Sequence, residues 1–400
     1  MLKTNDHKFP NNFFWGTATS SHQVEGGQNN DWTEWEPGKI NDGSVSGQAC
    51  DSWNRYSEDF DLIQKLNNNA YRFSIEWSRI EPEEGKWNQE AISRYQKMVL
   101  ELRQRKIEPF VTLHHFTNPI WFSKKGGWKN SQAPELFGRY CQKMAENLPQ
   151  VKYWIPLNEP EVYALLSYLI GYWPPQKKSY FKTQRVRKNL VQAHQLAYQQ
   201  IKKIIPESEI GIAQNLIHFL PFRPSSILDR LASAFADRNY NRSFLNKTKD
   251  YLDFIGINYY YPSRLKFKLY SSRNFYRETV PQNAPKSDYG WEIYPEGLGR
   301  IIESVTQFKK PLYITENGIA DAKDKMRTKF IQDHLAILHK KISDGYDIRG
   351  YFYWSLLDNF EWREGYSKKF GLFSVDFKTQ ERKIRPSGEY YAKVCRDNKL

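Results

Sequence analysis

The sequence predicts an α/β protein built as a single (β/α)8 TIM barrel that spans residues 1–400. Two observations support this prediction. Eight short apolar segments alternate along the chain with segments whose apolar residues recur at helical spacing. Polar and charged side chains follow several of these apolar segments, where the strands are expected to end. Repeated strand-then-helix units give parallel strands with right-handed crossovers, and eight units close into a barrel with its active site at the C-terminal ends of the strands.

The predicted strands and helices take turns along nearly the whole chain. The strands are expected at residues 13–18, 70–77, 109–113, 151–157, 210–215, 254–260, 312–316 and 350–354. The helices are expected near residues 53–63, 92–102, 136–144, 186–205, 226–244, 291–308 and 330–342. An open doubly wound sheet is the main alternative. The chain has no glycine-rich GxGxxG turn after the first strand, which disfavours a dinucleotide-binding sheet.

Composition indicates a globular chain, and we expect no targeting segment. Hydrophobic residues make up 40% and aromatic residues 16%, including 13 tryptophans, and no Pro/Gly/Ser-rich linker divides the chain. The three cysteines, Cys50, Cys141 and Cys395, are too few and too scattered for a disulfide framework or a metal cluster, which favours a reducing compartment. The first ten residues are polar, and no apolar run has the length of a membrane span. We therefore expect a soluble, cytoplasmic protein.

The formal charge of +14 has two local sources, residues 177–188 and residues 264–277. In the second segment Lys266, Lys268 and Arg273 alternate with aromatic residues, a pattern that can bind nucleic acid or another polyanion. The alternative is a lysine-rich solvated surface. Because no nucleic-acid-binding module accompanies the charge, we favour the solvated surface and expect no nucleic-acid partner.

Two glutamates occupy equivalent places after predicted strands. Glu316 follows the apolar run 312–315, and Glu159 follows the run 151–157. A carboxylate at a strand end is as often a helix cap or an ion-pair partner as a catalytic group. The C-terminal ends of parallel barrel strands meet at one face, however, so the two glutamates are predicted to share one site.

Other strand-end residues have side chains that suit a sugar ligand. They are Gln23, Arg72, His115, Asn158, Asn258, Tyr260, Trp354, Glu361 and Trp362. Amide, imidazole and carboxylate groups bind hydroxyls, and an indole stacks on the apolar face of a pyranose. Adjacent His114 and His115 could suggest a metal, but neighbouring residues of a strand point to opposite faces, so we expect no metal site.

Five segments in this order resemble glycoside hydrolase family 1, the β-glucosidase-like enzymes. They are FFWGTATSSHQVEGG at 13–27, YRFSIEWSR at 71–79, NEP at 158–160, LYITENG at 312–318 and YWSLLDNFEWREGYSKKFGLFSVDF at 353–377. Together they span nearly the whole chain.

The resemblance implies a (β/α)8 barrel and the retaining hydrolysis of terminal β-D-glycosides, most of all β-glucosides, without a cofactor. It implies that Glu316 is the nucleophile and Glu159 the general acid/base. It also implies a sugar-binding set and a pair of supporting residues. The sugar-binding set is Gln23, His115, Asn158, Tyr260, Trp354, Glu361 and Trp362, and the supporting residues are Arg72 and Asn258.

Glycoside cleavage requires two carboxyl groups for a chemical reason that does not depend on the family resemblance. Cleavage of a glycosidic bond requires a proton on the leaving oxygen and a negative charge at an oxocarbenium-like centre. In retaining enzymes the two carboxyls lie about 5–5.5 Å apart, so both do not ionise easily at neutral pH. If Arg72 and Tyr260 contact Glu316, they favour its anion and leave the proton on Glu159.

Three features depart from the family pattern. Pro156 stands where the family usually has Thr, which removes a ladder donor from a central strand and puts the presentation of Glu159 in question. Phe116 stands where Trp is common, which removes an indole N–H, and the chain is shorter than many relatives. Pro156 leaves open a catalytically silent carbohydrate-binding protein. A transglycosylating β-glycosidase, in which an acceptor sugar replaces water, stays open within the same chemistry.

The resemblance also narrows the substrate. Relatives that act on 6-phosphorylated sugars replace the Glu-Trp pair and combine a lysine with a tyrosine farther on, whereas this chain has Glu361-Trp362 and Phe370, which predicts a neutral glycone. Thioglucosidase relatives lack the acid glutamate, so Glu159 predicts an O-glycosidase. The choice among glucose, galactose and fucose, the aglycone and the oligomeric state stay open.

Overall fold

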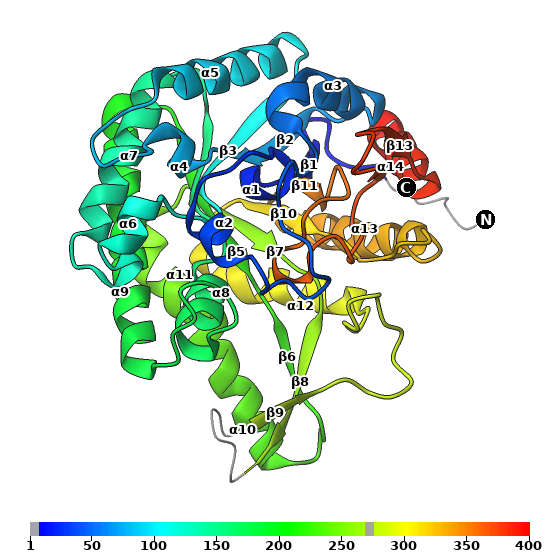
Figure 1. The fold of residues 1–400 in the computed structure, drawn as a ribbon. Helices are drawn as coiled ribbons and strands as arrows, with labels where there is room; N and C mark the ends of the chain where they lie inside the picture. Colours follow the sequence, from blue (N-terminus) through cyan, green and yellow to red (C-terminus); the bar gives the residue numbers. More distant parts are fainter. Residues whose placement is uncertain (1–7, 269–275) are drawn as a thin grey trace.

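A computed structural model describes residues 8–268 and 276–400 as a closed barrel of eight parallel strands, which confirms the predicted (β/α)8 architecture (Figure 1). Neighbours in the barrel are neighbours in the chain, apart from a small sheet inserted after the fifth strand. The barrel strands are β1 (Phe14–Ala18), β2 (Ala70–Ser74), β3 (Glu108–His114), β4 (Tyr153–Leu157), β5 (Glu209–Asn215), β7 (Phe254–Asn258), β10 (Leu312–Asn317) and β11 (Ile348–Trp354).

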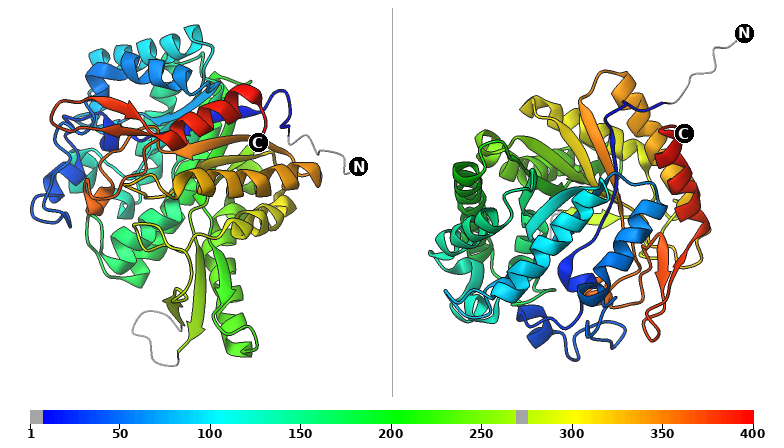
Figure 2. Two further views of the ribbon diagram at one scale, coloured as in Figure 1. Left: turned by 90° about the vertical axis from the view of Figure 1, so that its right-hand side faces the viewer. Right: turned by 90° about the horizontal axis from the view of Figure 1, so that it is seen from above.

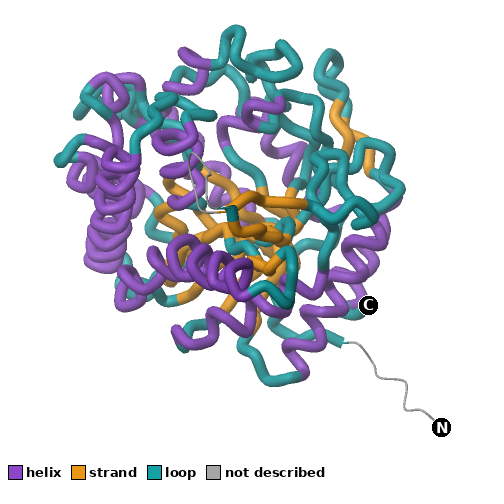
Figure 3. Tube along the Cα trace, turned by 90° about the horizontal axis from the view of Figure 1, so that it is seen from below, coloured by secondary structure: helices purple, strands orange, loops and turns teal. Residues whose placement is uncertain are grey.

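Helices surround the strands on all sides, as the view from below shows (Figure 3). The longer helices are α3 (Ser52–Lys65), α5 (Gln89–Gln104), α7 (Ala133–Asn147), α9 (Tyr180–Ile204), α10 (Ile227–Ala236), α12 (Pro295–Val305), α13 (Arg327–Ser343) and α14 (Pro386–Asp397). Short helices in the loops are α1 (Ser21–Val24), α2 (Asp31–Trp35), α4 (Trp77–Ile80), α6 (Ile120–Lys124), α8 (Pro160–Ala164) and α11 (Ser243–Thr248). Among the described residues, no helix has the length and apolar character needed to span a bilayer.

Aromatic rings fill the interior of the barrel. Phe110 of β3 stacks on Tyr153 of β4 with ring centroids 4.2 Å apart, and Phe254 and Tyr313 close the same layer. The neighbouring strands make room for these rings by carrying glycine, because a Cβ at Gly211 would overlap the ring of Phe254. The barrel interior below the strand ends is therefore filled by packed side chains.

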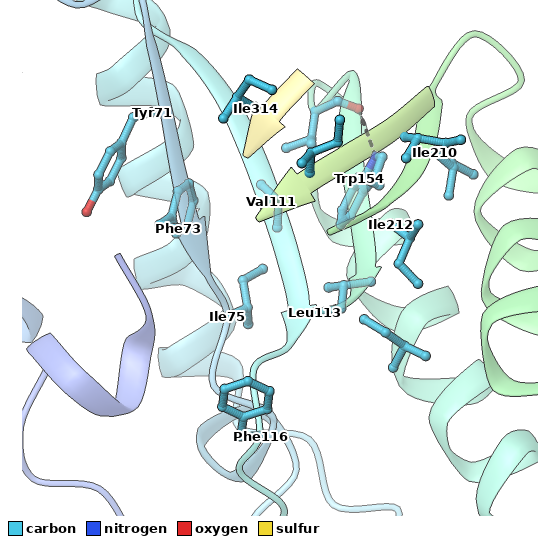
Figure 4. Close-up of a cluster of buried hydrophobic side chains, with 14 of the residues drawn as sticks. Tyr71, Phe73, Ile75, Val111, Leu113, Phe116, Trp154, Ile210, Ile212 and Ile314 are labelled. Atoms are coloured by element: carbon cyan, nitrogen blue, oxygen red, sulfur yellow. Dashed lines mark hydrogen bonds between the residues drawn. The ribbon is translucent and has the colours of Figure 1, made fainter. Parts of the chain in front are cut away.

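A second apolar layer joins the outer faces of the strands to the helices (Figure 4). Val111 and Leu113 of β3 point into it at period-two spacing, next to Phe73 of β2. Trp154 of β4 lies in the same layer, and its indole Nε1 donates to the carbonyl of Val151 over 3.0 Å. Strands buried on both faces explain why the barrel segments appear in the sequence as nearly continuous apolar runs.

Several predicted element limits differ from those in the structure. Strand β2 ends at Ser74 and not at residue 77, because Glu76 caps the short helix α4 by accepting from the Ser78 amide. Helix α12 begins at Pro295 and not at residue 291. The helix predicted at 226–244 is interrupted by a π-type segment, η3 (Asp237–Arg242), between α10 and α11.

A small sheet outside the barrel was not predicted. It consists of β6 (His218–Pro221), β8 (Pro262–Phe267) and β9 (Tyr276–Thr279), and with α10 it projects from the body of the molecule (Figure 2). The described residues of the basic segment 264–277 belong to this projection, and Arg273 lies outside the described residues. A short hairpin of β12 (Phe373–Val375) and β13 (Arg382–Ile384) also follows the barrel.

Pro156 lies at an interruption of the ladder between β4 and β5. The strands pair from Tyr153 to Trp154, and pairing resumes at Asn158 with the register shifted by one residue. Proline is tolerated at such a bulge because no amide donor is needed there. Beyond the bulge the amide of Glu159 donates to the carbonyl of Ala213 over 2.8 Å. The predicted loss of a ladder donor is thus local, and strand β4 still ends beside β5.

The glycine at 211 offers a test of the packed barrel interior. We expect Gly211→Ala to lower the free energy of unfolding by about 1–3 kcal/mol, because the added methyl group collides with Phe254. The matched control is Gly138→Ala in α7, where the added Cβ would meet only Leu196 at 3.4 Å and where alanine favours the helix. Denaturant unfolding of both variants measures the difference. Equal stability of the two variants would contradict the packing described here.

Candidate active site

A cavity of about 320 Å³ opens at the C-terminal ends of the barrel strands. Glu159 and Glu316 both line it, as do most of the residues predicted to bind a sugar. The predicted residues in its wall are His115, Asn158, Glu159, Tyr260, Glu316, Trp354, Glu361 and Trp362. Arg72 and Asn258 lie behind the wall and contact the two glutamates, and Gln23 lies behind Glu361.

Glu316 reaches the cavity because strand β10 is irregular at this point. The register against β7 shifts between Ile314 and Glu316, which marks a β-bulge. A regular strand would send neighbouring side chains to opposite faces, whereas here Thr315 and Glu316 both contact interior residues. The hydroxyl of Thr315 donates to Oδ1 of Asn258 over 2.7 Å. The bulge thereby turns the carboxylate of Glu316 toward β2 and the end of β7.

Two strong donors hold the carboxylate of Glu316. Nη1 of Arg72 donates to Oε1 over 2.5 Å, and the hydroxyl of Tyr260 donates to Oε2 over 2.6 Å. Both carboxylate oxygens of Glu316 therefore have a hydrogen-bond donor, and one of these donors is positively charged. Hydrogen bonds to the ionised form of a carboxyl favour that form, so this arrangement stabilises a negative charge on Glu316.

Glu159 follows the end of β4 in a left-handed backbone conformation, with φ 45° and ψ 56°. A non-glycine residue in this region is uncommon and is held there by its surroundings. Its amide bonds to Ala213, and Pro160 starts helix α8 directly after it. Oε1 of Glu159 accepts from Nδ2 of Asn258 over 2.8 Å. The described partners of this carboxylate are thus neutral amides, in contrast to those of Glu316.

Arg72 connects the strands that carry these groups. Its guanidinium is 1% exposed, and it donates to the Thr112 hydroxyl, the Thr315 carbonyl and the Glu316 carboxylate. Nη2 donates to Oδ1 of Asn158 over 2.6 Å. Four of the five N–H donors of Arg72 thus form hydrogen bonds, as a buried cation requires.

The two glutamates differ in what perturbs their pKa values. Burial raises the pKa of Glu159 to about 8, and the charge of Glu316 adds to this increase. Burial also raises the pKa of Glu316, but the Arg72 guanidinium and the Tyr260 hydroxyl oppose it. The first negative charge of the pair therefore resides on Glu316, and near neutral pH the proton stays on Glu159.

The hydrogen bonds around Asn158 determine the tautomer of His115. Oδ1 of Asn158 accepts from Arg72 and from Nδ2 of Asn258, so its amide nitrogen faces the imidazole. That nitrogen lies 3.1 Å from Nε2 of His115, which must accept. Burial and the charge of Arg72 hold the pKa of His115 well below its usual range, so the ring is neutral and carries its proton on Nδ1. Nδ1 is buried and has no hydrogen-bond partner among the described residues.

Two indoles and a third carboxylate complete the inner cavity. The His115 ring lies between Trp354 and Trp362, with centroids 5.8 and 5.9 Å away and nearly parallel planes. Burial, followed by the charge of Glu316, raises the pKa of Glu361 to about 8. Nε2 of Gln23 donates to Oε2 of Glu361 over 3.2 Å and so orients that carboxyl group.

The site has no arrangement typical of a metal centre. Within residues 8–268 and 276–400, no group of three or more His, Cys, Asp or Glu side chains is placed to hold a metal ion. His114 points away from His115, and its Nε2 lies 3.2 Å from Oδ1 of Asn118. The chemistry of the cavity is therefore that of carboxyl groups, amides and aromatic rings.

Comparison with known proteins places this geometry in a family. The sequence matches glycosyl hydrolase family 1 over residues 5–248 and 236–400. The chain belongs to glycosyl hydrolase family 1. It is 35% identical to the 1,4-beta-D-glucan glucohydrolase of Thermotoga neapolitana, over 98% of this chain and 99% of that protein. It is 30% identical to the 6-phospho-beta-galactosidase of Staphylococcus epidermidis, over 98% and 99% of the two chains.

Solved structures of the family have the same fold. The beta-glycosidase from Pyrococcus horikoshii superposes with a TM-score of 0.94 at 40% identity, over 99% of this chain and 96% of that chain. The Beta-glucosidase from Thermotoga maritima in complex with glucoimidazole gives 0.92 at 34% identity, over 98% and 100%. This family 1 protein is therefore an O-glycoside hydrolase, and more specifically a β-glycosidase. Its fold is a TIM barrel.

Several wall residues of this family 1 cavity were not predicted. Trp291 was placed in a helix, but it lies in the loop before α12 and stacks between Tyr289 and Tyr261, with ring centroids 4.0 and 4.8 Å away. The Pro295 that starts α12 was the signal for this loop. Phe116, noted as a departure from the family pattern, packs edge-on against Trp362. The outer wall also contains aliphatic side chains, those of Val162, Leu165, Leu166, Ile170 and Ile217.

The tautomer of His115 is a direct test of the site geometry. We expect a neutral ring protonated on Nδ1 throughout about pH 5–8, because burial disfavours the cation and Asn158 donates to Nε2. Long-range ¹H–¹⁵N NMR of protein labelled in histidine, with His115→Asn for assignment, measures both properties. An Nε2-protonated ring, or a cation in this range, would contradict the described orientation of Asn158.

Proposed function

We propose that the protein is a retaining β-glycosidase that removes terminal non-reducing β-D-glycosyl residues, foremost β-glucosyl residues, by double displacement. Glu316 is the nucleophile and Glu159 the general acid/base. One observation carries the proposal. Glu316 and Glu159 line one cavity. The carboxylate of Glu316 accepts hydrogen bonds from a cation and a phenol, whereas the carboxylate of Glu159 accepts from amides. This asymmetry supplies the anion and the acid that glycoside cleavage needs.

In the first step the carboxylate of Glu316 attacks the anomeric carbon as the bond to the leaving oxygen breaks. The Glu159 carboxyl gives its proton to that oxygen, and the aglycone departs as a neutral alcohol. The product is an ester between the sugar and Glu316. The charge of Glu316 is then gone, so one cause of the raised pKa of Glu159 disappears and Glu159 remains as a carboxylate.

In the second step Glu159 accepts a proton from water as the water oxygen attacks the anomeric carbon. The ester bond breaks, the sugar leaves with β configuration, and Glu316 recovers its charge. Arg72 and Tyr260 stay in place throughout and stabilise the carboxylate that forms again. An acceptor sugar in place of water would give transglycosylation by the same step.

We propose a neutral glycone, although 6-phospho-beta-galactosidases are among the relatives. The acidic groups in the described cavity wall are the carboxyls of Glu159, Glu316 and Glu361, and none of the described wall residues is lysine or arginine. A sugar phosphate would therefore find no cationic side chain in this wall, and the carboxylate of Glu316 would repel it. The nearby Lys368 donates instead to the carbonyl of Asp288, and its Nζ lies 5.6 Å from the ring of Tyr289.

The alternative of a silent sugar-binding protein rests on Pro156. The bulge at this residue leaves the amide of Glu159 bonded to Ala213 and its carboxylate bonded to Asn258, in the same cavity as Glu316. These contacts favour the interpretation that Glu159 can act as the general acid despite Pro156. We also propose a cytoplasmic location, which the three free, buried cysteines support.

Azide rescue of two alanine variants tests the assigned roles. With 2,4-dinitrophenyl β-glucoside, Glu316→Ala is expected to be inactive alone and to form α-glucosyl azide when azide is added, because azide attacks the anomeric carbon directly. Glu159→Ala is expected to form β-glucosyl azide, because azide attacks the ester on Glu316. On substrates with poor leaving groups Glu159→Ala should lose about 10²–10⁴-fold in kcat/KM.

The stereochemistry of the azide products, read by ¹H NMR, distinguishes the two glutamates. A Glu316→Ala protein with parental activity in the absence of azide would remove the assigned nucleophile. Sugar binding by the parent protein without turnover would favour the silent binder. Parallel measurements on glucosides, galactosides and fucosides, compared by kcat/KM, give the glycone preference.

A further inference from the structure

The projection beside the barrel carries an apolar surface on its outside. Helix α10 packs against β6 and β8 of the small sheet, and the side that faces the sheet is small or polar, with Ala232, Ser233 and Ala236 buried. The opposite side faces solvent and is apolar. We call the exposed apolar residues of this side, Ile227, Leu228, Leu231 and Phe235, together with the exposed Phe222 that follows β6, the outer apolar face.

The side chains of the outer apolar face are largely exposed in the part of the chain that the structure describes. Ile227 is 64% exposed, Leu231 60% and Phe235 58%. The residues recur at positions 227, 228, 231 and 235, which lie on one side of a helix. Single exposed apolar residues are ordinary on a protein surface, but a contiguous set on a projecting element marks an interaction surface. The helix is thus amphipathic with its apolar side outward.

Cations surround this face, and acidic groups near it are neutralised. Arg230 and Arg238 are exposed on the helical segment, and Lys266 and Lys268 are exposed on β8 and just after it. Nζ of Lys266 lies 5.8 Å from the ring of Phe222.

The acidic residues in 222–242 are paired with arginines. Asp229 accepts from Arg223 over 2.9 Å, and Asp237 accepts from Arg242 over 2.6 Å. This surface therefore combines exposed apolar side chains with the exposed cations Arg230, Arg238, Lys266 and Lys268.

A second basic segment adjoins the projection. Nη2 of Arg187 in α9 donates to the carbonyl of Asn239 over 2.7 Å, so α9 contacts the segment that continues α10. The same helix begins with Tyr180 and Phe181, which are 61% and 85% exposed, among the lysines of residues 177–188. Both basic clusters of the sequence thus include or adjoin exposed apolar side chains.

We propose that the outer apolar face and its flanking cations dock this protein on an anionic lipid bilayer. An interfacial helix inserts its apolar side among the acyl chains near the headgroups, while lysine and arginine bind acidic headgroups. A second copy fits less well, because a two-fold interface would bring Arg230 and Arg238 of both copies together. A nucleic acid would satisfy the cations and leave the apolar side chains in water.

Docking through α10 would hold the cavity close to the bilayer. Segment η3 continues α10 without a break, and its Tyr240 lines the cavity and donates to Oδ1 of Asn215 over 2.7 Å. The aliphatic outer wall of the cavity lies beside this segment. The proposal does not depend on the catalytic roles of the glutamates, so its failure and theirs are separate results.

Vesicle sedimentation with the full-length protein tests the docking surface. We expect binding to vesicles of phosphatidylcholine with about one third phosphatidylglycerol at low salt, and weak binding to phosphatidylcholine alone. Leu231→Asp with Phe235→Asp should weaken binding about tenfold or more, since two inserted side chains are lost. Arg230→Glu with Arg238→Glu should weaken it by a similar factor and flatten its salt dependence.

Matched variants elsewhere on the surface serve as controls. Leu100→Asp changes an exposed apolar residue of α5, and Lys340→Glu with Lys393→Glu makes the same change in net charge as the arginine pair. Both should bind vesicles like the parent. Hydrolysis of a soluble aryl β-glycoside and the Tm should be unchanged in every variant, because none of these residues lines the cavity.

Three results would overturn the proposal. The first is no vesicle binding at low salt. The second is binding that survives Leu231→Asp with Phe235→Asp, since the apolar face would then be irrelevant. The third is a dimer seen in sedimentation equilibrium, or a complex with duplex DNA, that these substitutions abolish, while neither the parent protein nor the variants bind vesicles. This result would assign the outer apolar face to a second copy or to DNA.

Discussion

The buried guanidinium of Arg72 is the interaction on which the rest of the site depends. A cation that is 1% exposed costs several kcal/mol to desolvate unless charged and polar partners surround it. Arg72 obtains these partners from three other strands or strand ends, and the acidic one is Glu316. The same guanidinium fixes the amide of Asn158, which in turn sets the tautomer of His115. One ion pair thus determines the charge of one group and the donor direction of another.

Both glutamates lie where the regular ladder of the barrel fails. Strand β10 is bulged before Glu316, and β4 changes register before Glu159. A regular strand alternates its side chains and presents one residue in two to the interior, so a bulge is needed to bring Thr315 and Glu316 to one face. The left-handed backbone of Glu159 adds a second local departure. The packed aromatic layer below these points supplies the rigidity that holds them.

The sequence was most informative about barrel strands and the residues at their ends. A strand buried on both faces is a continuous apolar run, so a carboxylate at its end, such as Glu159 or Glu316, stands out. The family motifs then assigned the roles that geometry alone leaves open. Contacts such as that between Arg72 and Glu316 join residues 244 positions apart, and they follow from barrel closure.

What the sequence left out has physical reasons as well. Trp291 has the apolar character of a core helix residue, and only the stacking of Tyr261 and Tyr289 on it shows that it belongs to a cavity wall. The strands β6 and β9 of the small sheet are only four residues long, so their pattern in the sequence is weak. Periodicity predicts that the apolar side of a helix faces the core. This inference is wrong for helix α10, because its apolar side faces outward.

The central claim is that Glu159 and Glu316 share one proton unequally because of their different partners. Carboxyl ¹³C NMR of glutamate-labelled protein, with Glu159→Gln for assignment, measures the pKa of Glu159 before and after Glu316 is esterified by a 2-deoxy-2-fluoro β-glucoside. We expect a pKa of about 8 in the free protein and a clearly lower value in the ester, because the charge of Glu316 has been removed. A pKa of Glu159 that stays the same or rises on esterification would contradict the account.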